Sequence, residues 1–326
     1  MRALVHENDG LHMTDVEPQQ PGDSEVVVKL KAAGLNRRDL GIPGRRKRSE
    51  EALILGSDGA GVVEETGKNV IDVQVGDEVI INPSLRWEQN SEAPPKEFDI
   101  LGMPDHGTFA EKIVISEDQL EPKPAYMSWE EAAAFPLAAL TGYRAMFTKG
   151  QLQKTDTVFI PGAGGGVATY LIAFAKNIGA RVITTSRSEE KREKAREHGA
   201  DVVIDTADDW EEKLGNETID MVIDSNGKAT FHRSLNILKK GGKFVTFGAT
   251  TEDVIDFDLR SFFYGQYKLI GSTMGCREEL RAALEHAENH ALHPVVDRVF
   301  SLDQSLEAFS YLDEGNQFGK VIIRIS

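Results

Sequence analysis

The amino-acid sequence predicts an α/β protein in which a doubly wound parallel sheet is inserted into a β-rich domain. Three observations support this fold class. Roughly the first hundred residues form short apolar runs separated by turn signals. From about Ser128 onward, strand and helix patterns alternate. Within that alternation, an apolar run leads into the glycine cluster Gly162–Gly166 just before a helical pattern.

The N-terminal part is predicted to be rich in short strands. Residues 25–31 alternate between apolar and polar side chains, and residues 59–65 form an apolar run interrupted by glycines. Residues 76–81 begin with a turn signal and continue as a strand. Residues 82–105 are polar and contain prolines, which indicates a lobe or a long loop.

The second half begins with two helical patterns, at residues 129–135 and 138–148, before the parallel sheet. The expected strands of that sheet are residues 157–161, 181–185, 202–204, 221–225, 243–247 and 268–271. The last elements are a helix at 305–312 and a strand at 319–325, which we expect to return to the β-rich part. We therefore divide the chain into a β-rich domain of residues 1–123 and 266–326 and a parallel-sheet domain of residues 124–265.

Composition excludes several classes of function. The formal net charge of −16 over 326 residues argues against nucleic-acid binding. No apolar stretch approaches the length of a membrane span, and the N-terminus has no signal-peptide core, so we expect a cytoplasmic protein with no membrane partner. Cys276 is the only cysteine, which rules out an intrachain disulfide and any zinc site with two thiolates.

Two local patterns each allow two interpretations. The cationic run Arg45-Arg46-Lys47-Arg48 is either a solvated loop balanced by nearby glutamates or a rim that attracts an anion. His286, His290 and His293 lie near a predicted helix end, where two imidazoles four residues apart can share a face. We favour a solvated helix terminus, because the Glu-x-x-His arrangement of a metal site is missing.

The glycine cluster predicts a binding site for the pyrophosphate of a dinucleotide. Glycine lets the backbone turn sharply and approach phosphates, and a helix that starts there offers free N–H groups and its positive dipole end. A purely structural turn is the alternative. The predicted contacts are Gly162, Ala163, Gly164, Gly165, Gly166 and Val167.

Over nearly its whole length the chain resembles the medium-chain dehydrogenase/reductase superfamily, and within it the zinc-independent branch similar to quinone oxidoreductases. Besides the glycine cluster, the motifs lie at residues 56–63 with 75–79, 191–201, 238–248 and 318–321. The resemblance implies a Rossmann NADP-binding domain inserted in a GroES-like catalytic domain. It also implies a homodimer or homotetramer.

The chain departs from the zinc-dependent members of this superfamily at the metal site. The positions that match their zinc-binding cysteine and His-Glu pair hold Asn36 and Ser57-Asp58. An amide and a hydroxyl do not replace a thiolate and an imidazole as zinc ligands. Residues 82–105 also lack the four cysteines of the structural zinc lobe. We therefore expect no zinc.

The end of the second parallel strand predicts the choice of cofactor. The family position that is acidic in NAD-binding members corresponds here to Ser186, and Arg187 and Lys191 add positive charge. Because an acidic group would repel the extra phosphate of NADP while arginine and lysine attract it, we expect NADPH rather than NADH. The alternative is that Arg187 only pairs with Glu190. The family aromatic residue beside the adenosine corresponds to Thr206, which weakens that contact.

The resemblance implies further cofactor contacts, some of which have local structural alternatives. Short polar groups suit a nicotinamide amide, but Thr141 could instead cap a helix and residues 271–275 could be an ordinary turn. The implied residues are Asn36, Thr141, Gly248, Ala249, Thr250, Ser272, Thr273, Phe318, Gly319 and Lys320.

The reaction implied is hydride transfer from NADPH to an acceptor that is already activated, a quinone or an α,β-unsaturated carbonyl compound. Candidate catalytic residues are Asn36, Asp39 and Tyr143, with Tyr264 a further candidate proton donor beside water or a ribose hydroxyl. Asp39 has an alternative role in bracing the Asn36 loop. Two other functions stay open: an alcohol dehydrogenase acting on simple alcohols or aldehydes, and an NADPH-binding sensor without turnover. Cys276 is interpreted as a bystander.

Overall fold

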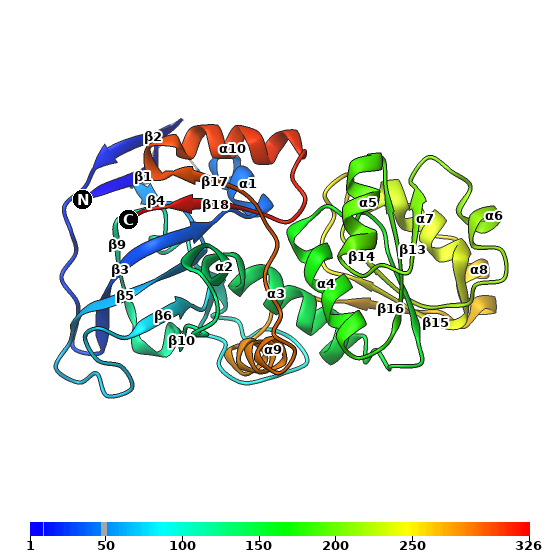
Figure 1. Cartoon of the computed structure of the whole chain (residues 1–326), viewed down its shortest axis with the longest axis horizontal. Coiled ribbons are helices and arrows are strands. Elements are labelled where there is room, and N and C mark those ends of the chain that lie inside the picture. Colours follow the sequence, from blue (N-terminus) through cyan, green and yellow to red (C-terminus); the bar gives the residue numbers. More distant parts are fainter. Residues whose placement is uncertain (9, 47–50) are drawn as a thin grey trace. The chain divides into compact units, whose positions relative to one another are not determined.

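The computed structural model describes residues 1–8, 10–46 and 51–326 and divides them into two compact units (Figure 1). Met1–Leu140 and Gly275–Ser326 form the first unit, and Thr141–Met274 forms the second. The sequence-based division placed the helix α2 (Trp129–Ala134) in the second unit. In the structure α2 packs on strands of the β-rich unit through the buried residues Ala132–Ala134, which moves the division to residue 140.

The first unit is built on a large, mostly antiparallel sheet. Its strand order is β10-β6-β5-β3-β18-β17, and β9 also pairs with β3. The bounds are β3 (Glu25–Gly34), β5 (Asp58–Thr66), β6 (Glu78–Ile81), β9 (Lys112–Ser116), β10 (Leu120–Pro122), β17 (Val296–Ser301) and β18 (Lys320–Arg324). As expected from the sequence, the C-terminal strand β18 returns to this sheet, where it runs antiparallel to β3.

Smaller elements complete the first unit. A second sheet has the order β2-β1-β4, and a third consists of β7 and β8, which lie in the predicted polar loop. The bounds are β1 (Arg2–Glu7), β2 (Gly10–Asp15), β4 (Leu53–Ile54), β7 (Ser84–Leu85), β8 (Asp99–Ile100), α1 (Arg37–Arg45), α9 (Arg277–Asn289), α10 (Ser305–Glu314) and the 3₁₀ turns η1 (Glu117–Gln119) and η3 (Leu302–Gln304).

Close packing explains the glycines that interrupt β5. A Cβ atom at Gly61 would lie 2.3 Å from the carbonyl oxygen of Lys29 on β3. That separation is far below van der Waals contact, so only glycine allows the two paired strands to approach this closely. The register between β3 and β5 pairs Gly34 with Asp58, which brings the ends of both strands to one place.

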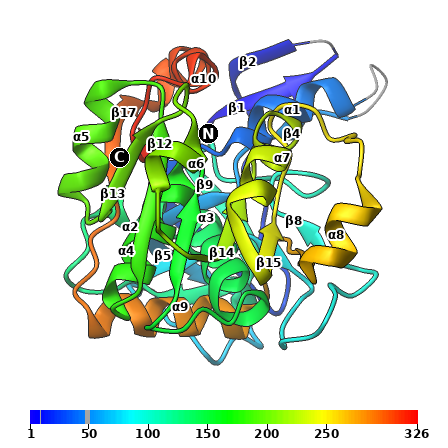
Figure 2. The ribbon, with the colours of Figure 1, turned by 90° about the vertical axis from the view of Figure 1, so that its right-hand side faces the viewer.

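The second unit is a parallel six-stranded sheet with the order β13-β12-β11-β14-β15-β16, so the predicted doubly wound α/β fold is confirmed (Figure 2). Its core contains Phe159, Trp210, Phe231 and Phe244. The strands are β11 (Thr157–Ile160), β12 (Arg181–Ser186), β13 (Val202–Asp205), β14 (Ile219–Asp224), β15 (Leu238–Thr246) and β16 (Lys268–Gly271). The helices are α3 (Pro136–Tyr143), which crosses the division, the π-helix η2 (Arg144–Lys149), α4 (Gly166–Asn177), α5 (Glu189–Glu197), α6 (Trp210–Leu214), α7 (Lys228–Ile237) and α8 (Leu259–Gly265).

One strand of this sheet differs from its prediction. β15 begins at Leu238 instead of residue 243, because Leu238 pairs with Ile219 before a register shift. Residues 239–243 are two glycines and three lysines, so this part of the strand shows no alternation of apolar and polar residues.

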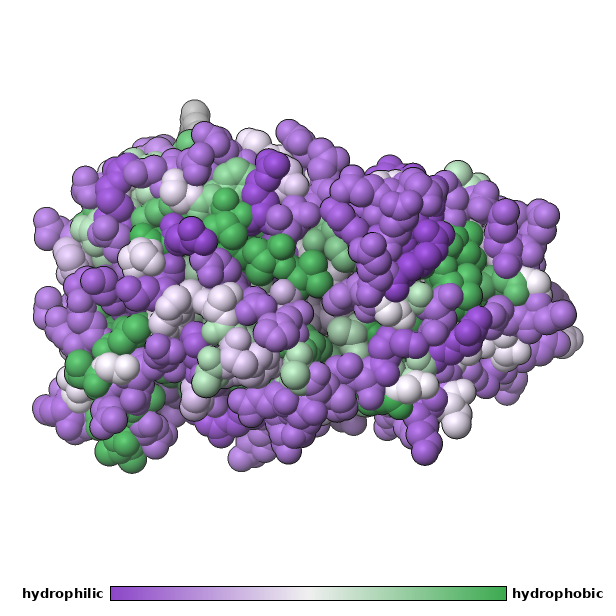
Figure 3. Space-filling model, in the orientation of Figure 1, coloured by the Kyte–Doolittle hydropathy of each residue, from purple (hydrophilic) through white to green (hydrophobic). Residues whose placement is uncertain are grey.

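The face of the molecule drawn in Figure 3 is mainly polar. Hydrophilic side chains cover most of the face drawn in Figure 3, in keeping with the high net charge. In the part of the chain that the structure describes, every helix is too short or too polar to span a bilayer.

Candidate active site

The glycine cluster forms a turn between β11 and the twelve-residue helix α4. Gly162 has φ +90°, a conformation that side chains with a Cβ rarely adopt. Gly165 is the N-cap residue of α4, in extended conformation, and no side chain caps the helix there. A Cβ at Gly165 would meet no atom within 4 Å. The first turn of α4 therefore keeps its backbone donors and open space for an anion.

Three hydrogen bonds hold this turn in place. The backbone N–H of Ala163 donates to the Thr185 carbonyl at 2.8 Å, and that of Gly162 donates to Thr185 Oγ1 at 3.2 Å. Asn226 Nδ2 donates to the Pro161 carbonyl at 2.9 Å. Asn226 was not identified from the sequence, although it lies two residues after the end of β14. A short amide after a parallel strand, level with the glycine turn, was the available signal.

Most of the predicted cofactor residues of the second unit follow the carboxyl ends of parallel strands. In a doubly wound sheet these ends meet at one edge, which is where such folds bind ligands. The glycine turn follows β11, Ser186 ends β12, Gly248–Thr250 follow β15, and Ser272 and Thr273 follow β16. The fold thus brings together residues that are far apart in the sequence.

Backbone hydrogen bonds anchor the two later segments at this edge. The N–H of Thr250 donates to the Ser225 carbonyl at 3.0 Å, and the N–H of Ser272 donates to the Thr246 carbonyl at 2.8 Å. The hydroxyl Oγ of Ser272 is buried and has no hydrogen-bond partner among the described residues. Buried polar atoms normally have a partner, so this hydroxyl fits a hydrogen-bonding ligand. Together with the uncapped start of α4, it makes this edge suitable for a dinucleotide.

The residues predicted to select the cofactor lie at the end of β12. Ser186 is 7% exposed, and its Oγ accepts a hydrogen bond from the Ser188 N–H at 3.3 Å. Arg187 is exposed and forms no ion pair within residues 1–8, 10–46 and 51–326. Glu190, its predicted alternative partner, pairs instead with Lys194 at 2.7 Å. The Arg187 guanidinium is therefore available to a ligand.

Arg192 is a cation near this position that sequence analysis missed. Its Nη1 donates to the Ser186 carbonyl at 2.9 Å and to Asp205 Oδ2 at 2.6 Å. The side chain is 12% exposed, and it also pairs with Glu189. Its position six residues after Ser186, on the helix that follows the strand, was the available signal. The more obvious Lys191 lies beside it in the first turn of α5, where its N–H donates to Ser188 Oγ.

Two predicted residues lie at the start of the second unit. Thr141 lies inside α3, so it does not cap the start of that helix. Tyr143 packs edge-on against Phe147 at 5.0 Å and Phe174 at 6.1 Å between ring centroids. This packing is the common use of a partly buried tyrosine, and it weakens the assignment of Tyr143 as a proton donor.

In the first unit, Asn36, Asp58 and Lys320 form a buried cluster. Lys320 Nζ donates to Asn36 Oδ1 at 2.6 Å and to Asp58 Oδ2 at 2.9 Å. Asn36 Nδ2 also donates to Asp58 Oδ2, at 2.9 Å. The second carboxylate oxygen of Asp58 accepts from the N–H of Leu137 at 2.8 Å. Buried charges require such partners, and here the ammonium and the carboxylate supply them to each other.

A second cation, partly buried, lies next to this cluster. Arg38 Nη1 donates to Ser57 Oγ at 2.6 Å and to the Leu101 carbonyl at 3.0 Å. Ser57 Oγ donates to the same carbonyl at 2.7 Å. The positions that hold zinc ligands in the zinc-dependent members are thus occupied by side chains bonded to arginine and lysine. Cationic neighbours of this kind do not suit a metal cation.

Asp39 lies in the first turn of α1 and is completely buried. Its Oδ2 accepts a hydrogen bond from the Asn36 N–H at 2.8 Å. Oδ1 lacks a hydrogen bond among the described residues but lies 3.9 Å from Arg38 Nη1. This geometry favours the bracing role, because a fully buried carboxyl does not reach a substrate. Burial raises the pKa of Asp39 to about 6.

The raised pKa of Asp39 predicts a pH-dependent loss of stability. Ionising the buried carboxyl costs free energy, so the native state loses stability as pH rises from about 4 through about 6. Asp39→Asn keeps an acceptor for the Asn36 N–H and has no charge to bury. The unfolding free energy of Asp39→Asn, relative to that of wild type, should therefore rise by about 1.4 kcal/mol per pH unit in this window, to a total of roughly 3 kcal/mol.

Urea unfolding of both proteins between pH 4 and 7.5 measures this difference. The exposed Asp313 is the control, and Asp313→Asn should not show a gain in unfolding free energy that grows with pH. If the unfolding free energies of Asp39→Asn and wild type differ by the same amount at every pH, the prediction is wrong.

Phe318 and Gly319 precede Lys320 and have structural roles of their own. Phe318 is buried, and its N–H donates to Asp297 Oδ1 at 3.0 Å. Gly319 has φ +105°, and a Cβ there would lie 2.4 Å from the Val295 carbonyl oxygen. Phe318 and Gly319 thus fix the backbone conformation just before Lys320 and determine where its side chain starts.

The remaining patterns from the sequence contribute no further site. His286 and His290 stack at 4.4 Å, and His293 Nδ1 lies 2.8 Å from Glu131. No group of three or more metal-binding side chains occurs in the described part of the chain. Burial raises the pKa of Cys276 to about 12, which fits an unreactive thiol.

Two further predicted features are Tyr264 and the cationic run at residues 45–48, of which the structure describes only Arg45 and Arg46. Tyr264 is exposed and stacks on Phe263. Arg46 donates to the His6 carbonyl at 2.8 Å, whereas Lys47 and Arg48 lie outside the described residues.

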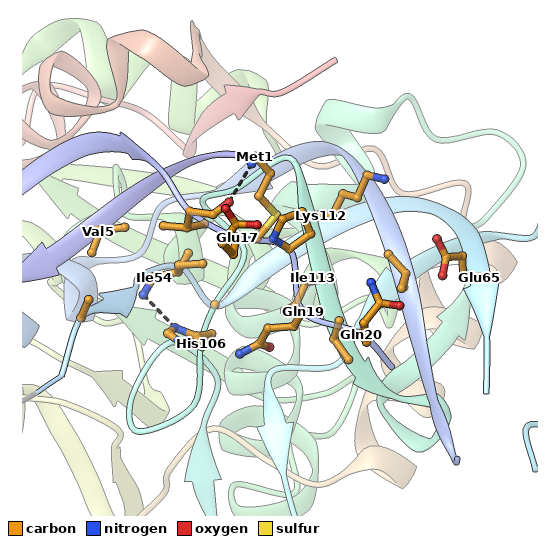
Figure 4. Close-up of a pocket in the computed structure, with 16 residues that line it drawn as sticks. Met1, Val5, Glu17, Gln19, Gln20, Ile54, Glu65, His106, Lys112 and Ile113 are labelled. Atoms are coloured by element: carbon orange, nitrogen blue, oxygen red, sulfur yellow. Dashed lines mark hydrogen bonds between the residues drawn. The ribbon is translucent and has the colours of Figure 1, made fainter. Parts of the chain in front are cut away.

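The first unit also contains a pocket of about 260 Å³ that none of the predicted residues lines (Figure 4). Its walls come mainly from residues 16–20 and from β9. His106 Nδ1 accepts from the Ile54 N–H at 3.1 Å at one side of this pocket. We do not assign it to the Asn36 cluster.

The chain belongs to the medium-chain dehydrogenase/reductase superfamily. Residues 22–125 match the alcohol dehydrogenase GroES-like domain, and residues 166–289 match the zinc-binding dehydrogenase domain. A zinc-type alcohol dehydrogenase-like protein of Leptosphaeria maculans is 31% identical over 97% of this chain and 94% of its own. The chain is therefore an oxidoreductase of this superfamily, as the sequence motifs predicted.

Other relatives are named for different substrates. An acryloyl-coenzyme A reductase of Sulfurisphaera tokodaii is 28% identical over 99% of this chain and all of its own. A solved NAD-dependent alcohol dehydrogenase superposes with a TM-score of 0.94 at 35% identity, with both chains fully covered. The solved 2-octenoyl-CoA carboxylase reductase CinF, in complex with NADP and 2-octenoyl-CoA, has a TM-score of 0.89 at 27% identity, covering 99% of this chain and 87% of its own.

Proposed function

We propose that this protein is an NADPH-dependent, zinc-independent oxidoreductase that reduces a quinone or an α,β-unsaturated carbonyl compound. The observation that carries the proposal is the cluster around Asn36 and Ser57, where the side chains at the metal-ligand positions are hydrogen-bonded to a lysine and an arginine. Without a Lewis acid, an acceptor activated by conjugation suits the site better than a simple ketone. The similarity to acryloyl-coenzyme A reductase, named for an unsaturated thioester, supports the same class of acceptor.

We assign cofactor binding to residues of the second unit and acceptor binding to a residue of the first unit. The turn 162–166 and the first turn of α4 would bind the cofactor pyrophosphate through backbone N–H groups. Arg187, next to Ser186, would bind the phosphate that distinguishes NADPH from NADH. Asn36 would orient a carbonyl oxygen by donating a hydrogen bond. The bound nicotinamide supplies the hydride.

One set of measurements tests this function against its alternatives. NADPH oxidation is followed with a small quinone, a panel of enones including unsaturated thioesters, and simple aldehydes, and NADPH binding is followed by fluorescence. Turnover of the activated acceptors with no zinc in the purified, untagged protein is the expected result. Binding without turnover on any acceptor would support a sensor, and chelator-sensitive alcohol oxidation would support an alcohol dehydrogenase.

Removal of the Arg187 charge should change the cofactor preference. In Arg187→Ser, kcat/KM for NADPH should fall about 10- to 100-fold, because one charge-assisted hydrogen bond contributes about 1.5 to 3 kcal/mol. The value for NADH should stay within about threefold. Arg196→Ser is the control, since Arg196 is also exposed but lies at the other end of α5. An equal loss with both nucleotides would refute the assignment.

We also propose that the chain forms a homodimer through the edge of the parallel sheet. β16 is the end strand and pairs only with β15 among the described residues, and α8 lies beside β15 (Figure 2). Exposed apolar side chains gather on these elements, and a second copy would cover both them and the open strand edge. They are Leu259, Phe263, Tyr264 and Leu269.

Light scattering tests this interface. Wild type should have twice the chain mass, and Phe263→Glu with Leu269→Glu should be a monomer. Ile71→Ser, which removes an even more exposed apolar side chain from the first unit, should leave the mass unchanged. A dimer that persists in the double variant would place the interface elsewhere.

A further inference from the structure

The orientation of the Asn36 amide is determined by two charged neighbours. An ammonium group can only donate hydrogen bonds, so the Asn36 atom 2.6 Å from Lys320 Nζ must be the oxygen. A carboxylate can only accept, so the atom 2.9 Å from Asp58 Oδ2 must be the nitrogen. Amide orientations are often ambiguous, but this one is fixed by chemistry.

One donor of this amide is left over. The Nδ2 group carries two hydrogens, and Asp58 accepts one of them. The second has no acceptor within the described ranges of the chain. Asn36 as a whole is 8% exposed, at the end of β3 and the start of α1. A donor buried to this extent normally has a partner, so the second hydrogen is available to water or to a bound molecule.

The register of three strands assembles this cluster. β3 and β18 pair Gly34 with Ile322, and the same antiparallel register, continued by two residues, places Asn36 opposite Lys320. β3 and β5 pair Gly34 with Asp58. The Lys320 side chain is only 3% exposed, so it cannot act as a mobile surface lysine. Its ammonium is committed to Asn36 and Asp58.

We propose that Lys320 is a positioning residue that holds the Asn36 amide with its free Nδ2 hydrogen directed to the carbonyl oxygen of the hydride acceptor. This inference rests on the proposed function. A positive charge bonded to Oδ1 polarises the amide, and its N–H becomes a stronger donor to an oxygen that gains negative charge during reduction. Lys320 therefore acts through Asn36 and does not itself contact the acceptor.

Substitution of Lys320 tests the proposal through steady-state kinetics. Lys320→Met keeps much of the side-chain volume and removes the charge. It should lower kcat/KM for the acceptor about 10- to 100-fold, mainly through kcat, and change NADPH affinity less than about threefold. Lys112→Met is the matched control, because it removes an ammonium that pairs with Glu64 in the same unit. Its kinetics should equal those of wild type.

A double variant separates positioning from stability. In Lys320→Met with Asp58→Asn no charge is left unpaired, so the unfolding midpoint should return toward that of wild type. The amide introduced by Asp58→Asn would donate to Asn36 Oδ1 and turn the Asn36 amide around, so activity should stay low. If the double variant recovers both its unfolding midpoint and its activity, the proposal is wrong and Lys320 has only a structural role. Wild-type activity in Lys320→Met would lead to the same conclusion.

Amide NMR provides a test that does not depend on turnover. In wild type the Asn36 Nδ2 proton bonded to Asp58 should exchange slowly with solvent, and the Lys320 ammonium on Oδ1 should shift both Nδ2 proton signals. In Lys320→Met both signals should move and the exchange should become faster, and unchanged shifts and exchange would overturn the proposed positioning. If wild type reduces no acceptor, the proposed function fails, while this spectrum still decides whether Lys320 orients Asn36.

Discussion

A Gly165→Asp variant should lose NADPH affinity by about 100-fold or more while its unfolding midpoint stays equal to or above that of wild type. Gly165 has the extended conformation of an N-cap residue, and the space around its missing Cβ is open. An aspartate there would cap α4, which stabilises a helix by about 1 kcal/mol. The same carboxylate would repel a pyrophosphate, at about 4 kcal/mol for charges roughly 4 Å apart near a protein surface.

The opposite signs of the two effects make this prediction specific. Fluorescence titration with NADPH measures the affinity, and thermal unfolding without cofactor measures the stability. Gly165→Asn is the matched control: it can cap the helix without adding charge, so its affinity should fall far less than that of Gly165→Asp. Unchanged NADPH affinity in Gly165→Asp would mean that the glycine turn is only structural, which is the alternative that the sequence left open.

An Asp58→Asn variant should lose about 3 to 5 kcal/mol of unfolding free energy. The substitution leaves the Lys320 ammonium, 3% exposed, without its counter-charge. Removing one partner of a buried ion pair has this effect because the remaining charge cannot regain its hydration. Lys320→Met should show a loss of similar size, and the two together should lose much less than the sum.

Urea denaturation at pH 7 measures these differences. Asp303→Asn is the matched control: Asp303 also pairs with a cation at 2.9 Å, but its side chain is 74% exposed. That substitution should leave the stability almost unchanged, because exposed ion pairs contribute little. Additive losses in the Asp58 and Lys320 variants would contradict the cluster as the structure describes it.

The sequence predicted the fold and family well because the signals were local. The strand from residue 157 and the glycines from Gly162 onward are contiguous, so periodicity and turn chemistry identify them directly. Prediction was weaker where a strand lacks apolar alternation, as at the start of β15. The two units also divide near residue 140 instead of residue 123, because the burial of α2 depends on packing against distant strands.

The candidate site was predicted in part. Asn36, Ser57-Asp58 and Lys320 were each noticed, but from separate motifs and for different reasons. That Lys320 bonds to Asn36 and Asp58 depends on strand register between segments that are hundreds of residues apart. Arg192 and Asn226 were missed because each is an ordinary residue on its own element, and only the sheet brings them to the glycine turn or to Ser186.

The sequence by itself determined the order of the elements, the dinucleotide-type turn, and the replacement of zinc ligands by an amide and a hydroxyl. These features are properties of neighbouring residues or of single positions. Only the tertiary structure decided which charges meet, that Asp39 is buried enough to raise its pKa to about 6, and that one Asn36 hydrogen has no acceptor among the described residues. Ion pairing and desolvation depend on distance in space, which local sequence does not contain.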